Sequence, residues 1–135
     1  MEPISAPSRE KLLDALRFDA NGLIAAVAQQ HDTGEVLMLA WMDRAAVEES
    51  LATGRAVYYS RSRKALWRKG ETSGQTQRLV DLRLDCDGDA VLLLVDQAGV
   101  ACHTGRRSCF SWALRDGEVA SIAPVLADPK ALYGQ

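Results

Sequence analysis

The sequence VDLRLDCDGDAVLLLV, residues 80–95, decides the fold class. Apolar and polar side chains alternate from Val80 to Cys86, which is the period of two expected of a strand with one buried face. The Asp-Gly pair that follows is a hairpin-turn signal, and residues 90–95 supply an apolar return strand. The stretch therefore predicts a β-hairpin.

Further strands are predicted on the N-terminal side of this hairpin. Two apolar runs within residues 23–41 flank a turn signal at 31–34, so this segment also reads as a hairpin. Residues 56–60 are rich in aromatic and branched side chains, which suit a pleated surface. These strands do not alternate regularly with helices, and the sheet is therefore expected to be largely antiparallel.

Short helices complete an α+β fold. Residues 9–16 predict a helix capped by Ser8, and a second helix is expected to begin after Asp43 and to stop at Gly54. Together with the strands they predict an α+β domain with a largely antiparallel sheet and a few short helices.

Length and composition indicate one domain spanning residues 1–135, with 47% hydrophobic and 25% charged residues. All four prolines fall within residues 1–8 and 124–135, which are expected to be loose ends. A net charge of -2 argues against a strongly basic nucleic-acid or anionic-membrane binder. The longest apolar stretch, residues 36–42, is too short for a membrane span. We expect a cytoplasmic protein whose partners include neither nucleic acid nor membrane.

Three cysteines, Cys86, Cys102 and Cys109, cannot all pair within one chain, and their spacing fits neither a C-x-x-C redox motif nor paired zinc knuckles. Buried, inert thiols are one interpretation. The other is a Zn²⁺ site, because three thiolates leave a tetrahedral zinc with one position for water, as in catalytic sites. His103 adjoins Cys102, and strand geometry would turn it away from the metal, so it is a candidate proton carrier rather than a ligand.

Three carboxylates, Asp85, Asp87 and Asp89, surround Cys86 and suit Mg²⁺ rather than zinc. In an extended strand Asp85 and Asp87 point to one face and Cys86 to the other, which predicts two separate metal sites. A solvated acidic hairpin tip is the alternative. An EF-hand loop is strongly disfavoured, because Ala90 occupies the position that requires glycine and residues 92–95 are apolar where ligands should lie.

A basic segment, residues 61–69, is followed by Gly70-Glu71-Thr72-Ser73-Gly74. Hydroxyls and free backbone amides beside Lys and Arg can hold phosphate, and Glu71 can act as a base. A solvated basic face and a surface carboxylate are the alternatives. The segment matches no Walker loop and no dinucleotide-binding motif.

Four blocks in colinear order between about residues 23 and 112 resemble the phosphoribosyl-AMP cyclohydrolase family of histidine biosynthesis. The blocks are LMLAWM (37–42), SRSR with LWRKGETSG (60–63 and 66–74), DCDGD (85–89), and CH with SCF (102–103 and 108–110).

The resemblance implies hydrolytic opening of the adenine ring of 1-(5-phosphoribosyl)-AMP between N1 and C6. It implies an intertwined homodimer in which Cys102 and Cys109 bind zinc together with Cys86 of the partner subunit. The three aspartates would bind magnesium. The remaining candidates are His103 and Glu71 as catalytic residues, and Arg61, Arg63, Trp67, Lys69, Thr72, Ser73 and Gly74 as substrate contacts.

Two other functions compete with this interpretation. A zinc deaminase acting on nucleobases would carry an H-x-E and P-C-x-x-C signature, which the sequence lacks. A non-enzymatic, zinc-stabilised module could use the basic segment to bind nucleotides or RNA. The pair Arg106-Arg107 fits either phosphate contact or solubility.

Overall fold

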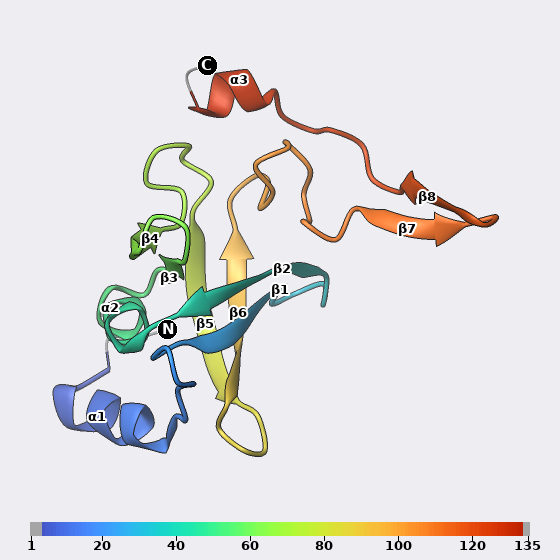
Figure 1. Cartoon of the computed structure of the whole chain (residues 1–135). Coiled ribbons are helices and arrows are strands. Elements are labelled where there is room, and N and C mark those ends of the chain that lie inside the picture. The colour runs from blue at the N-terminus through green and yellow to red at the C-terminus, as the bar shows by residue number, and fades with distance from the viewer. Residues whose placement is uncertain (1–3, 134–135) are drawn as a thin grey trace.

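The protein is described by a computed structural model that covers residues 4–133. Figure 1 shows a sheet with two helices on one side and a separate hairpin on the other. In chain order the elements are α1 (Ala6–Ala15), β1 (Ile24–Gln30), β2 (Val36–Met42), α2 (Arg44–Thr53), β3 (Val57–Ser60), β4 (Ala65–Arg68), β5 (Gln77–Leu84), β6 (Ala90–Gln97), β7 (Trp112–Arg115), β8 (Glu118–Ser121) and α3 (Pro129–Tyr133). No helix within the covered residues is long and apolar enough to cross a membrane.

The main sheet has six strands in the order β4-β3-β2-β1-β6-β5. Both predicted hairpins are present, as β1–β2 and β5–β6. The two hairpins join through β1 and β6, which run parallel, whereas the other neighbours in this sheet are antiparallel. The largely antiparallel α+β architecture is therefore confirmed, with one parallel pair in the middle.

One face of the sheet is buried under the helices. Along β1 the residues Ile24, Ala26 and Ala28 are buried and their neighbours only half so, which is the period-two pattern of a strand. Helix α2 packs Val47 and Leu51 into the same core. It begins at its predicted cap and ends at a glycine with a φ of 74°.

The chain differs from the sequence predictions at two element ends. Helix α1 starts at Ala6 rather than after Ser8, because the Ser5 hydroxyl accepts a hydrogen bond from the Ser8 amide and caps it. Strand β5 ends at Leu84, so Cys86 lies in an exposed turn and not on the apolar strand face that alternation predicts. Local turn formation at residues 85–89 overrides the strand period there.

The expected loose ends contain helix. Residues 6–8 form the first turn of α1, and α3 lies within the predicted C-terminal loose end, while residues 1–3, 134 and 135 lie outside the described range. Strands β7 and β8, which the sequence analysis did not predict, form a two-stranded sheet of their own.

A network of hydrogen-bonded polar side chains links four strands of the main sheet with the loop that follows β6. The Tyr58 hydroxyl donates to Gln77 Oε1 at 2.6 Å, and Gln77 Nε2 donates to Gln97 Oε1 at 2.8 Å. The backbone amide of Gln97 donates to Gln30 Oε1 at 2.9 Å, and the same oxygen accepts from Arg107 at 3.0 Å. Buried polar groups cost free energy when they are unpaired, so this network fixes the relative positions of the four strands and the loop.

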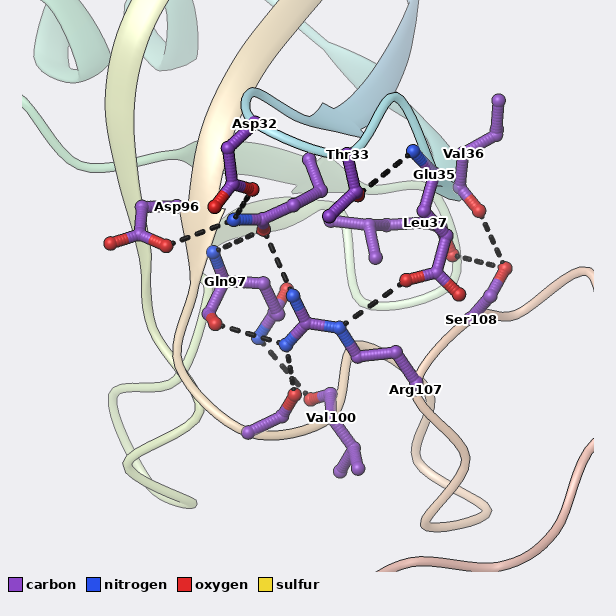
Figure 2. Close-up of polar contacts among 12 residues, drawn as sticks. Asp32, Thr33, Glu35, Val36, Leu37, Asp96, Gln97, Val100, Arg107 and Ser108 are labelled. Atoms are coloured by element: carbon purple, nitrogen blue, oxygen red, sulfur yellow. Dashed lines mark hydrogen bonds and ion pairs between the residues drawn. The ribbon is translucent and has the colours of Figure 1, made fainter.

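Arg107 anchors the segment between β6 and β7 (Figure 2). Its guanidinium donates to the carbonyl oxygens of Gln97 and Gly99 as well as to Gln30, and it forms an ion pair with Glu35 at 3.5 Å. Two residues further on, the backbone amide of Cys109 donates to the Leu37 carbonyl at 2.7 Å. Arg107, for which the sequence left phosphate contact and solubility open, therefore holds the loop after β6 against the main sheet.

Replacing Arg107 with Met should lower the free energy of unfolding by about 1–3 kcal/mol, because three acceptors lose a charged donor. Urea unfolding followed by tryptophan fluorescence, at one fixed protein concentration, measures this change. Arg78→Met is the matched control: Arg78 is exposed and has one ion pair, with Asp96 at 3.5 Å, so a change within about 0.5 kcal/mol is expected. Equal effects of the two substitutions would contradict the anchoring role.

Candidate active site

A pocket of about 520 Å³ opens between the β2–β4 part of the sheet and two loops, residues 69–73 and 101–109. It gathers most of the residues singled out by the sequence. Those that line it are Arg61, Arg63, Trp67, Lys69, Glu71, Thr72, Ser73, His103 and Cys109. Segments separated by some forty positions in the chain thus meet in one cavity.

Aromatic rings form part of the pocket wall. Trp41 and Trp67 both line it, and the Trp67 ring lies 5.6 Å from the ring of the buried Tyr58. The Arg61 guanidinium sits 4.9 Å from the centre of the Trp41 ring, within the range of a cation–π contact. Flat apolar surfaces beside cations suit a ligand that combines a heteroaromatic base with phosphates.

The basic residues of the segment 61–69 serve different purposes. Arg68 forms a two-pronged ion pair with Glu49 at 2.6 and 2.8 Å, and this contact lowers the pKa of Glu49. Among the described residues, no carboxylate pairs with Arg61 or Arg63. These two exposed guanidinium groups therefore offer positive charge at the pocket rim.

Lys69 is the buried cation of the site, with 5% of its surface exposed. Its Nζ donates to the Ala101 carbonyl at 2.6 Å and lies 5.4 Å from the centre of the Trp67 ring. Desolvation lowers the pKa of Lys69, and negative charge at Cys109 and Cys102 opposes that shift. The ammonium is thus held beside the two cysteines.

Cys102 and Cys109 lie close enough for their thiols to interact. Desolvation raises the pKa of Cys109 to about 11, and the neighbouring Cys102 adds to the increase. For Cys102 desolvation acts in the same direction, but the Thr104 hydroxyl, 3.0 Å from the sulfur, and other hydrogen bonds lower the pKa. Two thiols of unequal acidity therefore lie together beside a lysine, and Cys109 is the one that lines the pocket.

The loop at 70–76 places the remaining polar groups. Gly70 has a φ of 81°, and a Cβ at this position would come within 2.4 Å of the Thr76 backbone nitrogen. Only glycine allows so tight a return, and it turns Thr72 and Ser73 toward the pocket. Glu71 and His103 also reach the pocket from exposed positions, whereas Gly74 belongs to the loop but not to the lining.

Cys86 and the three aspartates lie elsewhere, at the turn between β5 and β6. This turn and the Cys102–Cys109 loop are attached to opposite ends of β6, whose eight residues extend over roughly 23 Å (Figure 1). Within residues 4–133 no group of three or more His, Cys, Asp or Glu side chains is placed to hold a metal ion. One copy of the chain therefore brings two of the three thiols together.

The acidic turn holds two carboxylates in contact. The Asp89 backbone amide donates to Asp85 Oδ1 at 3.0 Å. The Asp85 side chain, by hydrogen bonding and by its charge, raises the pKa of Asp89, while the pKa of Asp85 falls through hydrogen bonds that outweigh desolvation. Asp87 is exposed on the same turn.

Sequence reasoning missed several lining residues, including Trp41, Tyr59 and Ala101. Trp41 was assigned only to a strand, although it stands within one of the motif blocks. A large aromatic side chain at the end of an apolar strand was the signal in the sequence that could have pointed to Trp41 as a lining residue. Ala101 contributes through its backbone carbonyl, which no pattern of side chains reveals.

Comparison with known proteins places these features in a family. Residues 38–111 match the family model described as phosphoribosyl-AMP cyclohydrolase. The chain is 68% identical to the phosphoribosyl-AMP cyclohydrolase of Rhodospirillum centenum, over 93% of this chain and 95% of that protein. It is 66% identical to the protein of the same name from Granulibacter bethesdensis, over 91% and 97% of the two chains. The chain therefore belongs to the phosphoribosyl-AMP cyclohydrolase family of enzymes.

Proposed function

We propose that the chain hydrolyses 1-(5-phosphoribosyl)-AMP, opening the adenine ring between N1 and C6, as a step of histidine biosynthesis in the cytoplasm. Membership of the family supports the substrate. The observation that carries the proposal is that Cys109, with Cys102 beside it, lines one pocket together with two tryptophans and with two arginines that have no carboxylate partner among the described residues. Nothing comparable supports a deaminase or an RNA-binding module.

The donor set at the pocket wall fits zinc. Cys102 and Cys109 are adjacent soft ligands, and Cys86 is exposed and available to a second copy of the chain. We therefore propose a homodimer in which Cys86 of one copy joins the thiol pair of the other. When bound, zinc would supply Lewis acidity and lower the pKa of a water molecule. The positive charge of Lys69 would offset part of the negative charge of the thiolates.

The reaction adds one water molecule: its oxygen bonds to C6, the C6–N1 bond breaks, one of its protons ends on N1, and the other ends on the exocyclic imine nitrogen, which becomes the amide NH2. His103 lines the pocket from the same loop that carries the two cysteines, and we propose that it takes a proton from the attacking water and delivers it to N1. Glu71, on the opposite loop, is the second candidate for handling this proton.

The two phosphate groups would be held at the pocket rim. Arg61 and Arg63 supply charge, and Thr72, Ser73 and the amide of Gly74 supply hydrogen-bond donors on the tight loop. Trp67 would contact the base. Lys69 lines the same pocket, but its buried ammonium favours a position beside the thiols over direct contact with phosphate.

For magnesium we propose the turn formed by Asp85, Asp87 and Asp89. Its oxygen donors have the right chemistry, and the adjacent carboxylates of Asp85 and Asp89 repel each other less when a cation lies between them. The turn would approach the pocket of the second copy together with Cys86.

Ring-opening activity should appear when the purified protein is given zinc, magnesium and phosphoribosyl-AMP, and the change in absorbance follows it. Removing zinc with a chelator should abolish turnover while the far-UV circular dichroism spectrum remains, because the hydrophobic core does not depend on the metal. Unfolding on chelation would favour a structural zinc, and salt-sensitive RNA binding without turnover would contradict the proposal.

Mixing inactive variants tests the shared thiol. In a one-to-one mixture of Cys86→Ala and Cys109→Ala chains, half of the dimers are mixed and each mixed dimer has one intact site, so about a quarter of the wild-type activity should return. The control is a mixture of Cys102→Ala and Cys109→Ala chains, which has no intact site in any pairing. Recovery in the control, or none in the first mixture, would contradict sharing.

Replacing His103 with Ala should reduce kcat by about 100-fold or more, the usual contribution of a general acid–base. The zinc content, measured by atomic absorption, should stay unchanged, because His103 is not proposed as a ligand. His31→Ala is the control, since His31 lies in the exposed β1–β2 turn and should retain full activity. Loss of zinc from His103→Ala would instead indicate a ligand.

A further inference from the structure

We infer that Gln75 is a positioning residue, which fastens the loop of residues 70–74, here called the polar loop, to the backbone just before Cys102. The inference rests on the proposed function, because it explains how the proposed phosphate donors and the proposed zinc ligands keep one spacing. Gln75 is not among the residues that line the pocket, so it acts through the loop.

The polar loop is held at both ends by neighbouring backbone groups of one segment. At its start, Lys69 Nζ donates to the Ala101 carbonyl at 2.6 Å. At its end, the Val100 amide donates to Gln75 Oε1 at 2.8 Å. Val100 and Ala101 directly precede Cys102 in the chain. The two contacts therefore join the polar loop to the part of the backbone that leads into the thiol pair.

Gln75 also orders the polar loop itself. Its backbone amide donates to the Ser73 hydroxyl at 3.2 Å, and its side-chain Nε2 donates to the Ser73 carbonyl at 3.3 Å. Because the Ser73 hydroxyl accepts that bond, its own proton stays available for a ligand in the pocket, which Ser73 lines. One side chain thus bonds the loop through its nitrogen and the segment before the thiol pair through its oxygen.

Gly99 leaves the space that the Gln75 amide group occupies. The φ of Gly99 is 65°, and a Cβ at this position would come within 1.8 Å of Gln75 Oε1 and 2.8 Å of Gln75 Cδ. Only glycine allows so close an approach. Gln97 supports the backbone on both sides of the contact, since its Nε2 lies 3.3 Å from the Val100 carbonyl oxygen (Figure 2) and 3.2 Å from that of Gln75. The fold therefore reserves this place for the Gln75 side chain.

The contact matters for the proposed substrate because it sets a distance. The polar loop carries hydroxyl donors for a phosphate group, and the thiol pair marks where C6 reacts, so their spacing has to match two parts of one molecule. A loop that is free to shift binds the phosphate less tightly in the ground state and in the transition state alike, because the phosphate is remote from the bond that breaks. Such a uniform loss raises KM and leaves kcat unchanged.

Steady-state kinetics and hydrogen exchange on the zinc-loaded full chain test the inference. In Gln75→Ala the Val100 amide loses its acceptor, so KM for phosphoribosyl-AMP should rise about 10-fold while kcat stays within about twofold. Backbone amides in peptides spanning 70–76 and 98–101, followed by mass spectrometry, should both exchange at least about 5-fold faster. The zinc content, measured by atomic absorption, should stay unchanged.

Two further variants separate positioning from a general loss of structure. Gln75→Glu retains an oxygen that can accept from the Val100 amide, so its KM and exchange rates should return to within about threefold of the wild type. Gln29→Ala is the matched control: Gln29 is also half-buried and also bonds a backbone carbonyl, that of Gly34 at 2.8 Å, but it does not line the pocket. Its KM should equal that of the wild type. Circular dichroism verifies that every variant is folded.

Gly99→Ala breaks the same contact from the other side. Its new methyl group would displace the Gln75 amide, so KM should rise about as much as in Gln75→Ala. Once Gln75→Ala has removed that amide, nothing remains to be displaced. Any effect of backbone strain at a φ of 65° is common to both backgrounds and cancels from the comparison. Gly99→Ala should therefore raise KM at least about 5-fold more in the wild-type background than in Gln75→Ala.

The outcomes distinguish this inference from the proposed function. If folded Gln75→Ala keeps a wild-type KM or wild-type exchange rates, Gln75 is not a positioning residue, while ring-opening activity would leave the proposed function standing. A fall in kcat at unchanged KM, or equal effects of Gly99→Ala in the two backgrounds, would also overturn the inference. A wild-type protein without ring-opening activity would overturn the proposed function, and the exchange rates would then decide whether Gln75 joins the two segments.

Discussion

The contact on which the site depends is the set of hydrogen bonds that the Arg107 guanidinium makes with β1 and with the end of β6. The segment that carries Cys102 and Cys109 contains no helix or strand, and its internal backbone hydrogen bonds, which join Ala101 to Arg107 and Cys102 to Arg106, stop short of Cys109. One arginine with several acceptors, helped by the Cys109 amide on Leu37, ties this segment to the rigid sheet. The hydrogen bonds from Gln97 through Gln77 to Tyr58 also hold Tyr58, whose ring packs against Trp67 in the pocket wall.

The pocket combines groups that would be unstable apart. Lys69 is buried, which costs free energy unless hydrogen bonds or negative charge compensate it. The Ala101 carbonyl accepts its hydrogen bond, and Cys109 and Cys102 add negative charge when they are ionised. In return the lysine favours thiolates over thiols, and thiolates are what zinc requires. The proposed phosphate-binding side has exposed arginines instead, which would remain accessible to a charged ligand that enters from water.

A single chain leaves the proposed zinc site unfinished. Its third cysteine lies at the far end of β6 from the other two. In the proposed dimer, a second copy related by twofold symmetry would bring its own Cys86 to the thiol pair. Sharing a metal ligand across such an interface would make catalysis depend on assembly.

Local patterns in the sequence determined the two hairpins, the caps of α2 and the α+β class, because a period of two and a turn signal act over a few residues. They failed where a turn overrode the strand period at Cys86 and where a serine three residues upstream capped α1. The motif blocks named most of the pocket residues in advance. Only the tertiary structure decided that Lys69 is buried beside the thiols, that Arg107 is an anchor and that Cys86 lies at the opposite end of β6 from Cys102. Those outcomes depend on which distant backbone groups meet in space, and no spacing along the chain encodes that.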